Sequence, residues 1–187
     1  MIFVAYMGGT AGDMVASVID HRNSKFNFLQ QRMEMPLDRQ RFKKPHTFAS
    51  DAAKDEYVHQ ISAIYRSLPS HDIDYHVRSG HTTIGITVHD TKIAKWAAQR
   101  FKSVHRPQVW QQVCKACGIT TTRQYADLML HYSNMLEKQL PNTIKLERIV
   151  AGNLKDDLES VLGKKLDQES VNVYRNWLDL IKGRFIM

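Results

Sequence analysis

Apolar residues along this chain follow two alternating patterns, one typical of strands and one typical of helices. Short apolar runs lie at 1–6 and 83–88, and the second of them alternates with smaller or polar residues. In much of the remaining chain, apolar residues recur every three or four positions, as on one face of a helix. Strands that alternate with helices predict an α/β fold, with a mainly parallel sheet and helices on both of its faces.

The bounds of the predicted elements come from residues that cap or break regular structure. Pro69 and Pro141 each stop a helix, and Gly118 closes another. We expect strands at 1–6, 74–79, 83–88 and 143–147. We expect helices at 13–20, 26–35, 50–68, 92–104, 107–117, 122–140, 154–162 and 168–182. The second half of the chain is therefore predicted to be mostly helical.

Length and composition indicate one domain over residues 1–187, with an irregular basic insertion at about 23–49. Hydrophobic residues make up 43% and charged residues 24% of the chain, as in globular proteins. No apolar run approaches the roughly 20 residues that a membrane span needs, and the chain opens on a strand instead of a signal-like region. We therefore expect a cytoplasmic protein without a membrane partner.

The two cysteines, Cys114 and Cys117, have a C-x-x-C spacing. That spacing is found in redox pairs and in halves of zinc sites, but this chain has no second pair. We interpret both as ordinary residues of a helix, and a disulfide framework is excluded as the main source of stability.

Positive charge makes a polyanion such as DNA a plausible partner. The net charge is +7 and the pI is about 9.4. Basic residues gather between Pro36 and Pro45 and just beyond, next to Phe42 and Phe48, and we expect them to bind nucleic acid: Arg39, Arg41, Lys43, Lys44 and His46. Cations interleaved with aromatic rings suit phosphates and unstacked bases. A solvated loop with two buried rings is an equally open alternative.

A glycine-rich loop, Gly8-Gly9-Thr10-Ala11-Gly12, lies between the first predicted strand and the first predicted helix. Glycines let backbone N–H groups converge on an anion, and a helix N-terminus adds unpaired donors, so phosphate is the expected ligand. The P-loop pattern also needs Gly at 7, Lys at 13 and Ser or Thr at 14, whereas this chain has Met7, Asp13 and Met14. The alternative is a tight turn in which Asp13 caps the helix.

Three further side chains are candidates for the chemistry. Asp13 would lie beside a phosphate bound by the loop, where it could accept a proton or hold Mg²⁺, but its charge would repel phosphate unless a cation intervened. His81 follows Gly80 at the expected end of a strand and is a candidate base. Arg78 is a candidate replacement for the missing lysine. If all strands are parallel, 8–13, 79–81 and 89–92 share one edge of the sheet, where Lys92 would reach a nucleotide.

The order of these parts resembles the P-loop transferases, and in outline their sulfotransferase-like branch. In that branch a phosphate loop follows the first strand, a later strand ends in a catalytic His, and another strand leads to a helix whose Arg and Ser hold a nucleotide phosphate. The resemblance implies these roles for Gly8–Gly12, for His81, and for Arg100 with Ser103. It implies a phosphoadenosine phosphosulfate donor and no metal.

The Gly-Gly-Thr-Ala-Gly-Asp loop, the short chain and the basic insertion also resemble the compact bacteriophage kinases that phosphorylate 5-hydroxymethyluracil within DNA. This resemblance implies a kinase that uses ATP or another nucleoside triphosphate with Mg²⁺ and works in the host cytoplasm. Asp13 and His81 would share the roles of base and orienting group, and Arg78, Lys92 and Arg100 would neutralise charge. A third hypothesis is a nucleic-acid-binding module that has kept the fold and lost catalysis.

Overall fold

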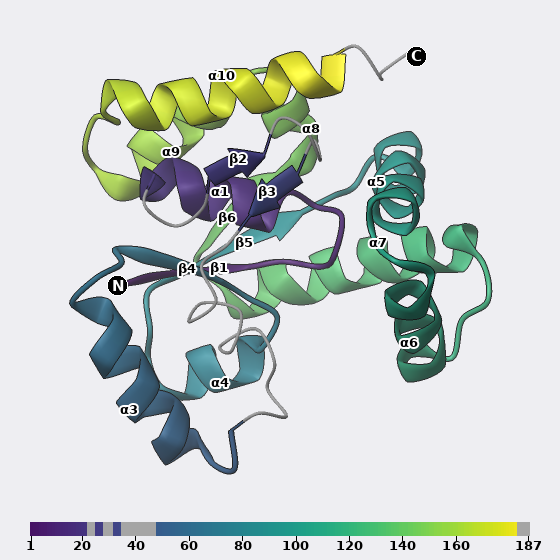
Figure 1. Cartoon of the computed structure of the whole chain (residues 1–187), viewed down its shortest axis with the longest axis horizontal. Coiled ribbons are helices and arrows are strands. Elements are labelled where there is room, and N and C mark those ends of the chain that lie inside the picture. Colours follow the sequence, from purple (N-terminus) through teal and green to yellow (C-terminus); the bar gives the residue numbers. More distant parts are fainter. Residues whose placement is uncertain (22–24, 28–31, 35–47, 183–187) are drawn as a thin grey trace.

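The computed structural model describes residues 1–21, 25–27, 32–34 and 48–182. Its main sheet has four strands, β1 (Ile2–Ala5), β4 (Ser67–Ser70), β5 (Thr83–Thr87) and β6 (Asn142–Lys145). Their order is β4-β1-β5-β6 and all neighbours are parallel (Figure 1). The α/β fold with a parallel sheet is therefore confirmed.

Helices cover both faces of this sheet (Figure 1). One face carries α1 (Gly12–Ile19), α9 (Leu154–Leu162) and α10 (Gln168–Lys182). The other carries α3 (Asp51–Ser62), α4 (Ile73–Arg78) and α7 (Thr122–Gln139). Helices α5 (Thr91–Val104) and α6 (Pro107–Cys117) lie beyond the carboxyl ends of the strands, and α8 (Leu146–Val150) follows β6 directly.

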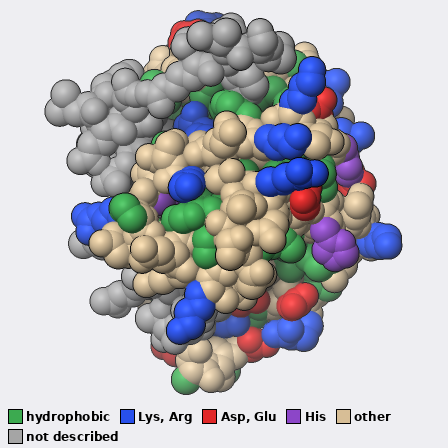
Figure 2. All heavy atoms as spheres, turned by 90° about the vertical axis from the view of Figure 1, so that its right-hand side faces the viewer, with side chains coloured by type: hydrophobic (Ala, Val, Ile, Leu, Met, Phe, Trp, Pro, Cys, Tyr) green, Lys and Arg blue, Asp and Glu red, His purple; other side chains and the backbone are tan. Residues whose placement is uncertain are grey.

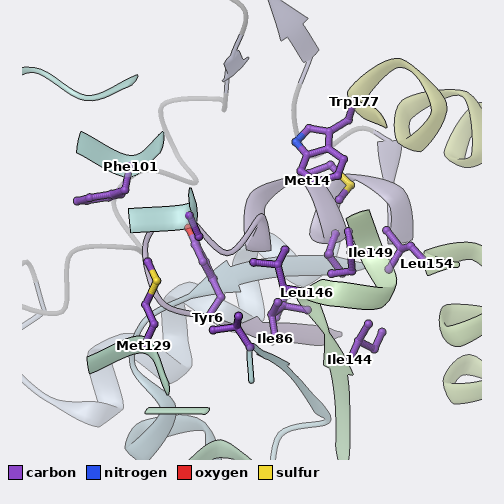
Figure 3. Packing of buried hydrophobic residues seen from close by; sticks show 14 of the residues in the cluster. Tyr6, Met14, Ile86, Phe101, Met129, Ile144, Leu146, Ile149, Leu154 and Trp177 are labelled. Atoms are coloured by element: carbon purple, nitrogen blue, oxygen red, sulfur yellow. The ribbon is translucent and has the colours of Figure 1, made fainter. Parts of the chain in front are cut away.

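Side chains of the first strand segment alternate between the two faces of the sheet and so contribute to the core on both faces. Val4 and Tyr6 of the first strand segment point into the cluster beneath α1 and α10, whereas Phe3 and Ala5 point to the opposite face. Figure 3 shows Tyr6 near the centre of the first cluster, with Met14 beside Trp177 of α10. Among the described residues, no helix is both long and apolar enough to cross a membrane.

Several of the predicted helices are confirmed. Helices α6, α9 and α10 have the predicted bounds. Gly118 ends α6 in the left-handed conformation, with φ 65°, and Thr121 begins α7 with a capping box. Asp90 caps α5 by accepting hydrogen bonds from the N–H groups of Lys92 and Ile93, at 2.7 and 2.9 Å. The last strand was predicted to end two residues too late, at 147 instead of Lys145, because α8 begins at Leu146.

Three other predictions are wrong. The helix expected at 50–68 ends at Ser62, and 67–70 form β4 instead. The strand expected at 74–79 is the helix α4, which Asp72 caps by accepting from the N–H of Tyr75 at 3.3 Å. The short helix expected at 26–35 is replaced by an antiparallel pair, β2 (Lys25–Asn27) with β3 (Arg32–Glu34). In the first two cases a tertiary contact or a cap overrides local propensity.

Candidate functional site

The glycine loop lies at the carboxyl edge of the sheet, which we define as the ends of the strands at Ala5, Ser70, Thr87 and Lys145. Ala11 is the N-cap of α1, with φ 64°, and its own side chain makes no capping hydrogen bond. The N–H groups of the first helical turn have no intrahelical acceptor and carry a partial positive charge. This end of α1 is therefore suited to an anion, and Asp13 lies in the first turn instead of at the cap.

Packing alone accounts for the glycines of the loop. A Cβ at Gly8 would lie 2.5 Å from the Phe101 ring, and one at Gly9, whose φ is +97°, would lie 2.5 Å from the Ala97 carbonyl oxygen. The Thr10 hydroxyl is also engaged, because it donates to the Met7 carbonyl at 2.7 Å. These contacts with α5 require small residues whether or not a phosphate binds.

Three side chains from different elements meet next to α1. The Tyr6 hydroxyl donates to Asp13 Oδ2 at 3.0 Å, and the His71 ring lies against the Tyr6 ring with centroids 4.3 Å apart. His71 Nδ1 is 2.8 Å from the Tyr6 carbonyl oxygen. A carbonyl only accepts hydrogen bonds, so this contact requires the proton on Nδ1 and leaves Nε2 as the basic nitrogen. His71 is exposed and directly follows β4.

Arg100 borders the same region. It is on α5, whose Ala97 and Phe101 contact the glycine loop, and its guanidinium lies 5.6 Å from the Trp96 ring centroid and 5.9 Å from that of Trp177. Ser103 does not extend toward the loop, because its hydroxyl donates to the Arg100 carbonyl at 2.9 Å. Arg100 is thus on the part of α5 whose residues Ala97 and Phe101 contact the glycine loop.

The segment after β5 also reaches the carboxyl edge, as predicted. Glu147 Oε1 fixes it by accepting from the N–H groups of His89 and Asp90, both at 2.6 Å. His89 Nε2 is 2.8 Å from Glu137, so this imidazole is held by a carboxylate. Lys92 is exposed in the first turn of α5.

His81 and Arg78 do not lie with the glycine loop. Because 73–78 are helical, His81 precedes β5 and lies at the amino edge of the sheet, opposite the loop. Its Nδ1 is 3.3 Å from Nδ1 of His76, and Arg78 forms an ion pair with Asp51 at 2.8 Å. The prediction that 79–81 share the edge of the loop is therefore wrong, and so is the assignment of these two side chains to its chemistry.

The amino edge holds a hollow of about 660 Å³, lined among others by Asp55, His59 and His81. Beneath it His76 is fully buried and stacks on Phe3, with centroids 3.9 Å apart. Burial, and next the charge of His81, lowers the pKa of His76 from 6.5 to about 3. Burial also lowers the pKa of His81. Both rings are therefore neutral in the folded protein near neutral pH.

We expect this histidine pair to make the fold sensitive to acid. The unfolded chain binds more protons below pH 6.5, so the stability from neutral His76 is fully present above pH 6.5 and is lost as the pH falls toward 3. Urea unfolding should show a loss of about 2 kcal/mol between pH 7 and pH 5. His76→Phe, which keeps a ring at this position, should flatten the profile, whereas His59→Gln should not. A wild-type profile as flat as that of His76→Phe would contradict the expectation.

The remaining candidates from the sequence are the basic residues of 39–46 and the two cysteines. Arg39, Arg41, Lys43, Lys44 and His46 lie outside the described residues. Cys114 and Cys117 are free thiols on α6, as interpreted, and burial raises the pKa of Cys117, which disfavours a reactive thiolate. Within the described ranges, no group of three or more His, Cys, Asp or Glu side chains is placed to hold a metal ion.

Sequence reasoning missed His71 because it missed β4. A signal was present, since Pro69 within a short run is typical of an edge strand, and a His two residues later would then end that strand. Comparison of the chain with protein-family models, with curated proteins and with solved structures finds no match in any of the three. The site's own geometry therefore carries the functional argument.

Proposed function

We propose that this protein is a nucleotide-dependent phosphotransferase that phosphorylates a hydroxyl group, with its reaction centre at the carboxyl edge between β1 and β4. The observation that carries the proposal is the contact of Asp13, Tyr6 and His71 beside the N-terminus of α1, whose N-cap residue is Ala11. In open α/β sheets, ligands bind outside the carboxyl ends of the strands. The proposed acceptor is 5-hydroxymethyluracil in DNA, as in the phage kinases that the glycine loop resembles.

In the proposed reaction, α1 and Arg100 hold the phosphates of the donor and His71 accepts the proton. The acceptor hydroxyl oxygen forms a bond to the γ-phosphorus of ATP, the bond from that phosphorus to the β,γ-bridging oxygen breaks, and ADP leaves. The hydroxyl proton passes to Nε2 of His71, while the Tyr6 carbonyl keeps the ring oriented through Nδ1.

Asp13 would supply one carboxylate ligand to an Mg²⁺ ion bound with the nucleotide. Mg²⁺ bound with a nucleotide takes one or two protein carboxylates together with phosphate oxygens and waters, so it needs no cluster of three protein ligands. Asp13 is in the first turn of α1, where donor phosphates would lie. When bound, the ion would neutralise charge on the phosphates, which also relieves their repulsion by this carboxylate.

Two alternatives each have one observation in their favour. A sulfotransferase-like enzyme with a phosphoadenosine donor is favoured by a strand, β4, that ends next to a histidine beside the glycine loop. A nucleic-acid-binding module without catalysis is favoured by the packing that explains Gly8 and Gly9 without a phosphate. Dependence of transfer on Mg²⁺ separates the kinase from the first, and nucleotide binding separates it from the second.

Thermal unfolding with nucleotides tests the proposal. ATP with Mg²⁺ at about 100 times its Kd should raise the Tm by about 5–10 °C, because it binds the folded state alone. Phosphoadenosine phosphosulfate should have no such effect; a shift with this donor alone would favour the sulfotransferase, and a shift with neither would overturn the phosphate-binding loop.

A pair of variants at Ala11 makes the test specific to α1. Asn and Asp both tolerate the left-handed conformation of this residue, whose φ is 64°, and they have nearly the same shape. Ala11→Asp places a negative charge at the anion site and should abolish the shift with ATP, whereas Ala11→Asn should retain it. Equal shifts in the two variants would place the nucleotide elsewhere.

A further inference from the structure

One stretch of the chain holds the whole of its excess positive charge. Between Asp90 and Asp127 there is no Asp or Glu. The same stretch contains seven cations: Lys92, Lys95, Arg100, Lys102, Arg106, Lys115 and Arg123. Removing these seven from the 26 Lys and Arg of the chain leaves 19, which equals the number of acidic residues. Outside α5, α6 and the start of α7, the chain is therefore balanced in charge.

Three of these cations form a stripe on the outer face of α5. Lys92, Lys95 and Lys102 are exposed, and their spacing of three and seven residues places them on one side of the helix. The buried residues of α5 lie on its other side: Ala94, Ala97, Ala98 and Phe101. At about 1.5 Å per residue the stripe spans about 15 Å. We call these three residues the α5 stripe.

The lysines of the α5 stripe contrast with four cations elsewhere on the protein, each of which contacts a carboxylate. Among the described residues, no carboxylate forms an ion pair with any of its three lysines. Elsewhere Arg78 pairs with Asp51, Arg148 with Asp157, and Lys155 and Lys165 with Glu159. Figure 2, which faces the side of α5 and α6, shows several Lys and Arg side chains there. An external polyanion would supply the missing negative charge.

An aromatic side chain borders the α5 stripe. Trp96 is half-buried on the same helix, and the Arg100 guanidinium lies 5.6 Å from its ring centroid. Proteins that bind single-stranded nucleic acid without sequence preference combine two features: cations that contact the phosphate backbone and aromatic rings on which bases stack. Helix α5 begins shortly after β5 ends, so a nucleic-acid strand bound along α5 would pass the carboxyl edge of the sheet.

We infer that the outer face of α5 binds a nucleic-acid strand through its phosphodiester backbone. The inference rests on the charges of α5 and not on catalysis, so it holds equally for a kinase and for a binding module. It assigns to α5 a role that sequence reasoning gave to the basic residues of 39–46.

Salt-dependent binding tests this inference. Fluorescence anisotropy should measure the Kd of a labelled 20-nucleotide single strand, and of the matching duplex, between 50 and 200 mM KCl. The triple variant Lys92→Gln, Lys95→Gln, Lys102→Gln should flatten the plot of log Kd against log salt by about 2 for the single strand and about 2.7 for the duplex. At 100 mM KCl the single strand should bind about a hundredfold more weakly.

The matched control removes the same charge from other parts of the surface: α7, the loop after α9, and α10. Lys138, Lys164 and Arg175 are exposed, and no described carboxylate forms an ion pair with them. The variant Lys138→Gln, Lys164→Gln, Arg175→Gln should keep the wild-type slope. Equal losses in both variants, an unchanged slope in the α5 variant, or no binding by the wild type would each overturn the inference. The shift of Tm with ATP is measured separately, so a negative result for the proposed kinase would not change the interpretation of the nucleic-acid binding data.

Discussion

His71→Gln should lower the rate of phosphoryl transfer to a hydroxymethyluracil oligonucleotide by about 10²–10⁴-fold, the range for loss of a general base. Glutamine is similar in size and can still donate a hydrogen bond to the Tyr6 carbonyl, which His71 Nδ1 now contacts at 2.8 Å. It has no basic nitrogen to take the place of Nε2. Transfer of labelled γ-phosphate from ATP measures the effect under single-turnover conditions.

The control for this variant is His59→Gln. His59 is exposed on α3 and lines the hollow at the amino edge, away from the glycine loop, so its replacement should leave the rate within about twofold of the wild type. The Tm shift with ATP should be the same in both variants, because neither removes a phosphate-binding group. If His71→Gln transferred phosphate at the wild-type rate, His71 would not be the base, and the contact with Tyr6 would be structural.

Gly12→Ala should destabilise the fold by about 3 kcal/mol, although the same change inside a helix usually stabilises it. A Cβ at Gly12 would lie 2.1, 2.2 and 2.6 Å from three carbons of the Tyr6 ring. That ring has little room to move, because it is 4% exposed and its hydroxyl donates to Asp13. Urea unfolding at pH 7 measures the change in the free energy of unfolding.

Gly118→Ala separates this clash from backbone strain. Gly118 has φ 65°, and a Cβ there would meet no atom within 4 Å, so only the cost of the left-handed conformation remains, about 1–2 kcal/mol. Gly12→Ala should therefore be the more destabilising of the two. A Gly12→Ala variant as stable as the wild type would mean that the Tyr6 ring can turn away from α1.

Much of the fold could be predicted because some segments carry their own boundaries. Helix α6 runs from Pro107 to Gly118, two residues that favour a helix start and a helix end. The apolar strand at 83–88 and the capped helix after it needed no information from distant residues. In these segments local and tertiary preferences agree.

The errors come from segments whose structure depends on distant partners. Ser67-Leu68-Pro69-Ser70 lacks the apolar alternation of a strand, yet it pairs with β1, and the Ser67 hydroxyl donates to the Ala16 carbonyl at 2.7 Å. Residues 74–79 alternate like a strand, but the Asp72 cap makes them helical. Because of these two errors, the sequence pointed to His81, which lies at the amino edge, instead of His71, which lies at the carboxyl edge. Without β4, His71 was not recognised as the residue after a strand, and the strand expected at 74–79 placed His81 near a strand end. The position of the glycine loop between β1 and α1 was predicted correctly, because glycines between a strand and a helix are a local signal.

Pro69 also limits the pairing of a further strand with β4, which is an edge strand of the sheet. Tyr6 N–H donates to the carbonyl of Ser70 and Ile2 N–H to that of Arg66, so alternate residues of β4 face β1 and Pro69 faces outward. Proline has no N–H to offer on that outer side. A fifth strand, whether from a second copy of the chain or from an unfolded neighbour, would meet a gap in its hydrogen-bond ladder at this point. We therefore expect this border of the sheet to resist edge-to-edge aggregation.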